Sequence, residues 1–218
     1  MTADPALINR ADEDWQRFQQ VTSMTNHWDR PGWTPGREAY FWYLTFDSPQ
    51  LRDLAEQCQQ QLQRDYLDPV PLGGLHLTLA RIGWADQVTD DQLQAASNRA
   101  HELCRETVPF ILSAGPLAGS SGAVRFSVTP WEPLTRLHHE LSNPTAVAGR
   151  SAFRPHIGIA YCNQAVPAGP LIAAIRSLRR LAPVDVPVSY IDLVRLHREH
   201  RAYAWSLYDR IPLSRASG

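Results

Sequence analysis

Two stretches, HLTLARI at residues 76–82 and FRPHIGIAY at residues 153–161, each place a histidine at the head of an alternating apolar pattern. This alternation is typical of a half-buried β-strand, because successive side chains of a strand point to opposite faces. In the first stretch we expect His76 and Thr78 on one face and Leu77 and Leu79 on the other. The apolar pair would pack into a core and the polar pair would face a cleft.

The second stretch repeats the arrangement of the first with one change. Strict alternation puts Arg154, His156 and Gly158 on one face and sets Ile159 and Tyr161 on the opposite one. A histidine in a single strand is usually structural, but two strands with matching apolar neighbours point to a shared polar cleft. The echo also indicates two related halves facing each other.

The remaining chain alternates between helical and extended patterns with frequent turns. Expected helices cover 15–21, 51–66, 89–106, 130–141 and 169–181, expected strands cover 40–46, 110–117, 123–128, 184–196 and 203–211, and a loop covers 143–152. The strands 110–117 and 123–128 should form a hairpin around residues 119–122. Because hairpins are frequent, the sequence predicts an α+β fold with antiparallel or mixed sheets and helices on the outside.

Composition restricts the chemistry of this 218-residue chain. A net charge of −1 and a pI near 6.7 are not those of a protein that grips long nucleic acid through many phosphates, so a nucleotide substrate should be short. All 21 positive side chains are arginine, since the sequence contains no lysine. A Walker A loop, a pyridoxal Schiff base and an ATP-dependent ligase with a lysine nucleophile are therefore excluded.

Nothing in the sequence suggests a membrane or an oxidising compartment. No apolar run approaches the roughly 18 to 20 residues of a membrane span, and residues 1–14 are polar and acidic. Cys58, Cys104 and Cys162 are isolated and have no paired spacing, which argues against disulfides and against a cysteine-rich zinc site. We therefore expect a cytoplasmic protein; the oligomeric state is left open.

The two histidine motifs resemble those of the two-histidine (2H) phosphoesterase superfamily, in particular its 2′-5′ RNA ligase and cyclic phosphodiesterase type. That family carries two copies of His-x-Thr/Ser-x, with x apolar. Residues 76–79 match in full, and residues 154–161 match in their Arg-Pro-His start and Ala-Tyr end but carry Gly158 where Thr or Ser is usual. The resemblance covers roughly 40–212. Residues 1–36 lie outside it and are interpreted as an N-terminal extension or lid, with 37–218 as a single bilobal domain.

The resemblance implies a duplicated bilobal α+β fold in which two sheets face a central cleft. It implies that His76 and His156 open or form a 2′,3′-cyclic or 2′-5′ phosphodiester of a small nucleotide or RNA end. One would act as general base and the other as general acid, without a metal or cofactor, and the sequence does not assign the two roles. Histidine suits both roles because its ordinary pKa lies near neutrality.

The same resemblance makes Thr78 a donor to a phosphate oxygen, a contact that Gly158 cannot make through a side chain. Arg154, on the face expected for His156, is a candidate replacement because guanidinium pairs well with phosphate. Tyr161 is a candidate for stacking on a base, as are Tyr40, Trp42 and Tyr190, although aromatic residues in strands are more often core. Trp28 and Trp33 could close over a base.

Other polar clusters favour structural interpretations. His138-His139-Glu140 lacks further ligands at useful spacing, so no metal site is expected. The mixed charges of residues 197–201 indicate a solvated turn. Two further functions remain open at this stage: a nucleotide-binding module that lost turnover with the hydroxyl at position 158, and an enzyme of small-molecule metabolism with a non-nucleotide substrate.

Overall fold

The computed structural model describes residues 10–142 and 153–214, so the predicted loop 143–152 lies outside the described residues. The helices are α1 (Arg10–Gln19), α2 (Pro49–Gln61), α3 (Asp90–Arg105), α4 (Glu132–Leu141) and α5 (Gly169–Leu178), with a short 3-10 helix at Leu72–Gly74. The strands are β1 (Ser23–Met24), β2 (Ala39–Thr45), β3 (Leu67–Pro69), β4 (His76–Trp84), β5 (Phe110–Ser120), β6 (Ala123–Thr129), β7 (His156–Cys162), β8 (Val166–Pro167), β9 (Val184–Val188), β10 (Tyr190–Glu199) and β11 (Ala202–Pro212).

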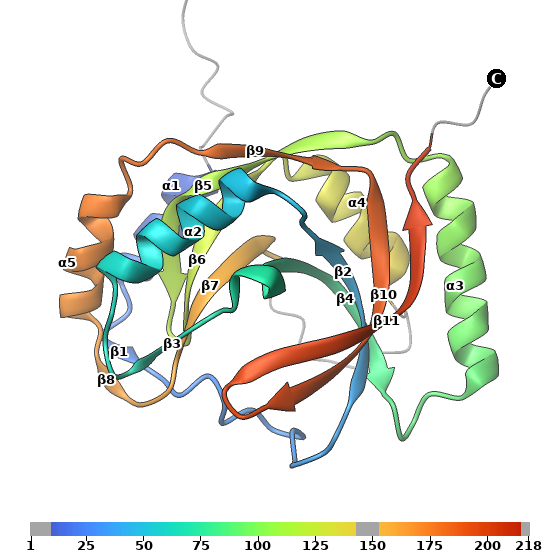
Figure 1. Ribbon diagram of the computed structural model, residues 1–218, viewed down its shortest axis with the longest axis horizontal. Coiled ribbons are helices and arrows are strands. Elements are labelled where there is room, and N and C mark those ends of the chain that lie inside the picture. The colour runs from blue at the N-terminus through green and yellow to red at the C-terminus, as the bar shows by residue number, and fades with distance from the viewer. Residues whose placement is uncertain (1–9, 143–152, 215–218) are drawn as a thin grey trace, which may run out of the picture.

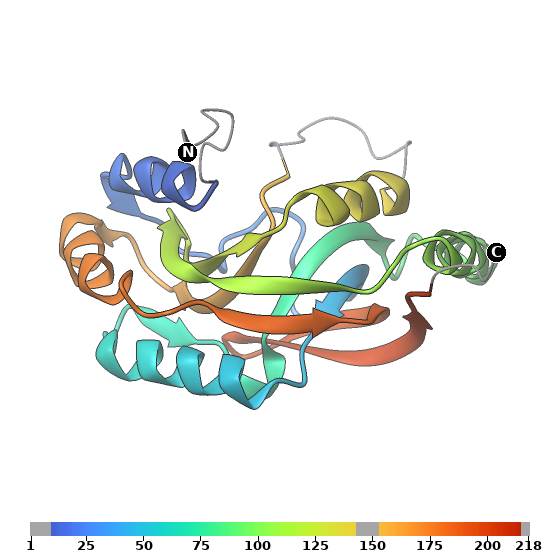
Figure 2. The same cartoon turned by 90° about the horizontal axis from the view of Figure 1, so that it is seen from above.

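Two antiparallel sheets form the centre of the molecule. One has the strand order β11-β10-β2-β4 and the other β3-β7-β6-β5-β9, and each contains one of the histidine strands, β4 or β7. Seen from above, α1 and α4 lie on one side of the sheets and α2 on the other, while α3 and α5 lie at opposite ends (Figures 1 and 2). The predicted α+β class with external helices is confirmed.

Local capping explains where the two longest helices begin. The Ser48 hydroxyl accepts a hydrogen bond from the Leu51 N–H (3.2 Å), and Thr89 and Gln92 form a reciprocal capping box. Both signals lie in the sequence, so these starts were predictable. The helix expected to run to Tyr66 instead ends at Gln61, and β3 follows it.

The strand predicted over 184–196 is wrong as a single element. The chain changes sheet at Ser189: β9 pairs with β5 on the edge of the five-stranded sheet, and β10 pairs with β2 in the four-stranded sheet. Pro187 fits this edge position, since proline lacks the N–H that a second partner strand would require. This crossing joins the two sheets through one continuous stretch of chain.

Helix α1 packs against the five-stranded sheet. Phe18 of α1 is fully buried against β5, so close that a Cβ added to Gly119 would lie 2.6 Å from the Phe18 ring. Met24 of β1 is also fully buried, and β1 pairs with β8. Phe18 and Met24 share one apolar cluster with the strands of both sheets. Among the described residues before residue 36, α1 and β1 therefore support the five-stranded sheet.

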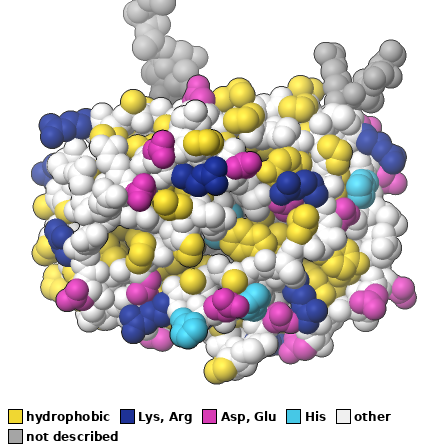
Figure 3. Space-filling view, viewed as in Figure 1, with side chains coloured by type: hydrophobic (Ala, Val, Ile, Leu, Met, Phe, Trp, Pro, Cys, Tyr) yellow, Lys and Arg dark blue, Asp and Glu magenta, His cyan; other side chains and the backbone are white. Residues whose placement is uncertain are grey.

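No helix among residues 10–142 and 153–214 is long and apolar enough to cross a membrane. On the face shown in Figure 3, acidic and basic side chains are interspersed, and neither sign gathers into a broad patch. This agrees with the near-zero net charge of the chain.

We predict that Phe18→Ala lowers the free energy of unfolding by about 3–5 kcal/mol, because a fully buried aromatic side chain leaves a cavity in the shared core. Urea denaturation measures the change, and Gln16→Ala, on the same helix away from the fully buried positions, is the control. A loss below about 1 kcal/mol, which is within the range of many ordinary substitutions, would show that α1 is not part of the cooperative core.

Candidate active site

A cavity of about 350 Å³ contains both motif histidines. It is lined by His27, Arg30, Trp33, Phe41, Tyr43, His76, Thr78, Ser120, Ala123, Arg125, His156, Gly158, Tyr161, Leu196 and Tyr203. The described lining thus contains three histidines and two arginines and no carboxylate, which makes it suited to an anion. A larger hollow of about 580 Å³ between α2 and β7 has no histidine among its described lining residues.

The two histidine strands have the same register with their neighbours. On β2 and β4, Thr45 lies opposite His76 and Tyr43 opposite Thr78, and the next pair skips Leu79. On β6 and β7, Ser127 lies opposite His156 and Arg125 opposite Gly158, and the next pair skips Ile159. The same irregularity therefore falls three residues after each histidine. Matching bulges beside both histidines are the structural form of the repeat seen in the sequence.

This bulge corrects the expectation for Tyr161. Strict alternation placed Tyr161 on the face opposite His156, yet both side chains line the cavity. The extra residue at Ile159 shifts the alternation by one, because a bulge sets two residues of one strand against one of its partner. Ala160, which strict alternation would put on the face of His156, lines the hollow beside α2 instead.

Each motif histidine has one ring nitrogen bonded to the backbone. The Nδ1–H of His76 donates to the carbonyl of Gly74 and that of His156 donates to the carbonyl of Arg154, both at 2.8 Å. A carbonyl can only accept, so these bonds place the proton of each neutral ring on Nδ1. Nε2 is then an acceptor, free to take a proton from a group in the cavity.

Burial keeps both rings neutral. Burial is the largest cause that lowers the pKa of His76 to about 4, and it likewise lowers the pKa of His156 to about 4, helped by the positive charge of Arg125. A bound phosphate would act in the opposite sense, since a nearby negative charge favours imidazolium. Both histidines are therefore neutral bases, and a bound anion would raise the pKa of either ring, so that it could act as an acid.

Aromatic rings and buried carboxylates hold the two motifs in place. Tyr43 stacks on His76 at 4.3 Å between ring centroids, and Trp205 meets the same imidazole edge-on at 5.2 Å. Beside His76, the Thr45 hydroxyl donates to Asp192, which also accepts two hydrogen bonds from Arg210. The two aromatic contacts and the bond to the Gly74 carbonyl fix the His76 ring, while Asp192 holds Thr45, its neighbour on β2.

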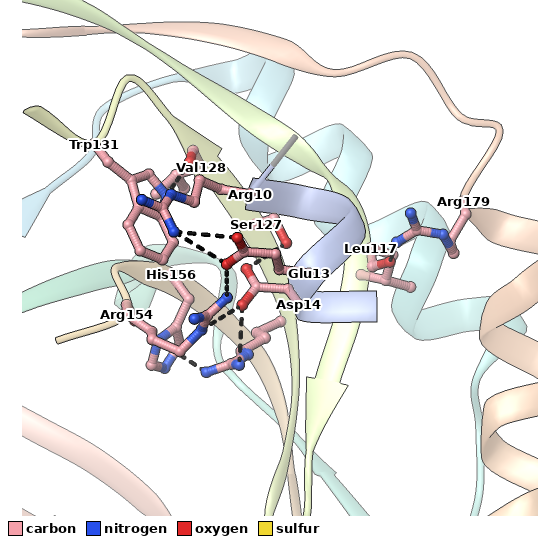
Figure 4. Close-up of polar contacts among 11 residues, drawn as sticks. Arg10, Glu13, Asp14, Leu117, Ser127, Val128, Trp131, Arg154, His156 and Arg179 are labelled. Carbon is pink, nitrogen blue, oxygen red and sulfur yellow. Dashed lines mark hydrogen bonds and ion pairs between the residues drawn. The ribbon is translucent and has the colours of Figure 1, made fainter. Parts of the chain in front are cut away.

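The half around His156 has an analogous network. The Ser127 hydroxyl donates to Asp14 at 2.9 Å, and Asp14 is fully buried. The Nε–H of Arg154 donates to the same carboxylate at 2.9 Å, and its Nη2 donates to Glu13 at 3.3 Å. Figure 4 shows Glu13 and Asp14 of α1 pointing toward Arg154, next to His156.

The structure thus brings five of the predicted site residues together around the cavity, namely His76, Thr78, His156, Gly158 and Tyr161. It does not bring Arg154 there. The Arg154 guanidinium is held by Asp14 and Glu13 and lies over the Trp131 ring, while its carbonyl orients His156. Arg154 precedes β7, so the alternation of the strand does not reach it.

Gly158 leaves a space that Tyr161 partly fills. A Cβ at position 158 would lie 3.3 Å from the Tyr161 hydroxyl, tighter than an ordinary van der Waals contact. The Tyr161 ring is fixed by stacking on His27 at 4.0 Å. In the other half, Thr78 is exposed and lines the cavity opposite Tyr43 on β2. The two halves therefore present different groups at equivalent positions.

His27 is a cavity residue that sequence reasoning missed. Its Nδ1 accepts from Arg30 at 3.1 Å, which leaves the proton on Nε2 to donate to the Tyr203 hydroxyl at 3.0 Å. Burial, aided by Arg30, lowers the pKa of His27 to about 3. Both ring nitrogens are hydrogen-bonded, so His27 holds Tyr203 through its Nε2 and Tyr161 through ring stacking. Its segment carries no motif; the backbone bond from the His27 N–H to the Cys162 carbonyl (2.7 Å) places it here.

Several other sequence candidates lie elsewhere. Tyr40, Trp42 and Tyr190 do not line the cavity, whereas Trp33 does. His138 donates to the Leu79 carbonyl (2.7 Å) and stacks on Phe153. Among the described residues no group of three or more His, Cys, Asp or Glu could hold a metal ion.

In the predicted solvated turn at residues 197–201, Glu199, His200 and Arg201 are exposed, whereas Arg198 is partly buried. Arg198 packs its guanidinium over the rings of Trp28, Trp33 and Tyr203, with 4.6 Å to the Trp33 centroid. Its Nη1 also donates to the Trp28 carbonyl at 2.8 Å. The turn therefore anchors the segment that contains Trp28 and Trp33.

Comparison with known proteins agrees with this geometry. Residues 46–200 match the model of the 2′-5′ RNA ligase superfamily, so the chain belongs to that superfamily, a group of 2H phosphoesterases. By sequence, no curated protein matches the chain.

Solved structures share the fold at low identity. The protein TT0787 of Thermus thermophilus is 22% identical with a TM-score of 0.61, and the match covers 82% of this chain and 98% of that one. LigT of E. coli in complex with 3′-AMP is 19% identical with a TM-score of 0.63, covering 82% and 99%. LigT in complex with phosphate is 19% identical with a TM-score of 0.61 and the same coverage.

The buried neutral histidines predict a pH-dependent stability. Between pH 6.5 and about 4, His76 and His156 bind protons in the unfolded chain but stay neutral in the folded protein. The free energy of unfolding should therefore fall as the pH falls. Each histidine contributes at most about 1.4 kcal/mol per pH unit. Urea denaturation at several pH values gives the slope of the free energy of unfolding against pH. This slope should be shallower for His76→Gln than for the unaltered protein, and unchanged for His139→Gln, which alters an exposed histidine. Equal slopes for all three would contradict the burial argument.

Proposed function

We propose that this protein is a metal-independent phosphodiesterase that acts on a 2′,3′-cyclic or 2′-5′ phosphodiester of a small nucleotide or an RNA end. The observation that carries the proposal is the pair of histidines with equivalent backbone hydrogen bonds, which leave two Nε2 atoms available in one cavity. Two histidines supply both proton transfers that opening a cyclic phosphate requires.

The cavity fits a substrate of this size and charge. A volume of about 350 Å³ lies at the lower end of the range of small-molecule sites, which is roughly 300–1,000 Å³. Its walls combine arginines with the aromatic rings of Trp33, Phe41, Tyr43, Tyr161 and Tyr203. Arginine suits a phosphate, and an aromatic face suits a base. A mononucleotide or a single exposed RNA end satisfies both.

In the proposed reaction one histidine, neutral at Nε2, takes a proton from water as the water oxygen bonds to phosphorus. The bond from phosphorus to the 2′ or 3′ oxygen breaks, and the second histidine, as imidazolium, gives its proton to that leaving oxygen. The two rings end with exchanged protonation states, and exchange with solvent restores them. Ligation follows the same path in the same direction, with a 5′ hydroxyl in the place of water as the group that bonds to phosphorus.

The remaining candidates take supporting roles in this proposal. Thr78, exposed in the cavity, donates to a non-bridging phosphate oxygen, and Tyr161 supplies a hydroxyl beside Gly158 together with a face for the base. Arg154 acts on the substrate only through the orientation of His156. Gly158 provides room for Tyr161.

The structural relatives support a nucleotide substrate. LigT has been crystallised with 3′-AMP, with ATP, with NADP+ and with phosphate. A shared fold and superfamily make a nucleotide phosphate the first substrate class to test here. Three free, buried cysteines accord with our proposal of a cytoplasmic setting.

We predict that His76→Ala and His156→Ala each lower kcat on a 2′,3′-cyclic nucleotide by about 10² to 10⁴, the usual contribution of one general acid or base. His139→Ala, which alters an exposed histidine on α4, is the matched control and should retain full turnover. Turnover by the unaltered protein should persist in EDTA. Product formation is followed by chromatography of the 2′- and 3′-monophosphates.

Three results would contradict the proposal. Loss of activity in EDTA with recovery on adding a divalent ion would place a metal in the mechanism. Binding of the cyclic nucleotide without turnover would favour a nucleotide-binding module. Activity on a non-nucleotide phosphodiester alone would favour an enzyme of small-molecule metabolism.

A further inference from the structure

The repeat of the two motifs locates the group that stands in for the missing hydroxyl at position 158. In the half around His76, Thr78 lies opposite Tyr43 on β2. In the half around His156, Gly158 lies opposite Arg125 on β6. Residues directly opposite on neighbouring strands share a face of the sheet. Arg125 therefore occupies the cavity face beside the position where the first half has its threonine.

Arg125 is a buried cation with incomplete bonding. It is 9% exposed, and its Nε has no hydrogen-bond partner among the described residues. Its Nη1 lies 3.3 Å from His156 Nδ1, but that nitrogen already donates its proton to the Arg154 carbonyl. A guanidinium can only donate, so this contact brings two donors together.

The nearest carboxylate leaves Arg125 partly uncompensated. Asp14 lies 3.7 Å from Arg125 Nη2, whereas it accepts from Arg154 at 2.9 Å and from Ser127 at 2.9 Å. Burial lowers the pKa of Arg125, and Asp14 opposes this. The cavity lining that the structure describes contains no carboxylate. A phosphate entering the cavity would give this guanidinium the acceptors it lacks.

We propose that Arg125 binds a non-bridging oxygen of the substrate phosphate on the His156 side, in place of the hydroxyl that Gly158 lacks. This inference rests on the proposed function for the identity of the substrate, but the anion site itself does not depend on turnover. Thr78 holds the phosphate by a neutral hydroxyl on one side, and Arg125 holds it by a charge on the other. The two halves therefore treat the phosphate differently although their histidines are equivalent.

The test measures binding of inorganic phosphate by isothermal titration calorimetry and, separately, turnover of a 2′,3′-cyclic nucleotide. Arg125→Gln should weaken phosphate binding by about 10- to 100-fold, as expected for losing hydrogen bonds from a charged group. Tyr161→Phe, which removes only a hydroxyl from the same side, should weaken it less. Arg179→Gln is the matched control, because Arg179 is also a largely buried arginine but donates to the Leu117 carbonyl outside the cavity.

A melting curve of each variant separates loss of the site from loss of the fold. Should Arg125→Gln fail to fold, Arg125→Lys is the second variant. It keeps the charge but loses the paired donors of the planar guanidinium, so it should bind phosphate more weakly than the unaltered protein. Phosphate affinity indistinguishable from that of the unaltered protein in a folded Arg125 variant would overturn the inference, as would a larger loss in Tyr161→Phe. If the unaltered protein turns over no nucleotide but Arg125→Gln still loses phosphate, the proposed function fails and the anion site stands.

Discussion

In each motif, the Nδ1–H of the histidine donates to the backbone carbonyl two residues earlier, at 2.8 Å in both cases. This bond fixes the tautomer and the direction of a ring that burial keeps neutral, so that Nε2 is the atom offered to the cavity. The bond is formed where each strand begins. Strand register, the matching bulges and the packing of β4 and β7 into separate sheets of one core bring the two histidines to the same cavity.

The two halves agree in their backbone and differ in the charges around it. Beside His76, Asp192 is satisfied by Arg210 and Thr45, and the cavity receives a neutral threonine. Beside His156, Asp14 is satisfied mainly by Arg154 and Ser127, and the Nε of Arg125 has no hydrogen-bond partner among the described residues. Since α1 supplies Asp14, a helix before the matched superfamily region contributes to the hydrogen-bond network around His156.

The sequence was sufficient for those features that depend on local pattern. Alternation located β4 and β7, and the capping residues Ser48 and Thr89 marked helix starts. The sequence did not predict the features that depend on how distant strands pair. The bulge at Ile159 appears only when β7 pairs with β6, and it moves Tyr161 into the cavity. His27 and Arg125 reach the site through β1, β6 and their partners, and neither stands in a pattern that marks it. Arg154 stood in such a pattern, but an acidic pair on α1 captures its side chain.

A crystal structure of the protein with inorganic phosphate tests the central claim most directly, namely that His76 and His156 act together on one phosphate. We expect a single phosphate in the cavity lined by both histidines, with its oxygens at hydrogen-bond distance, about 3 Å, from Nε2 of each. A phosphate seated outside this cavity, or one in contact with only one of the two histidines, would contradict it.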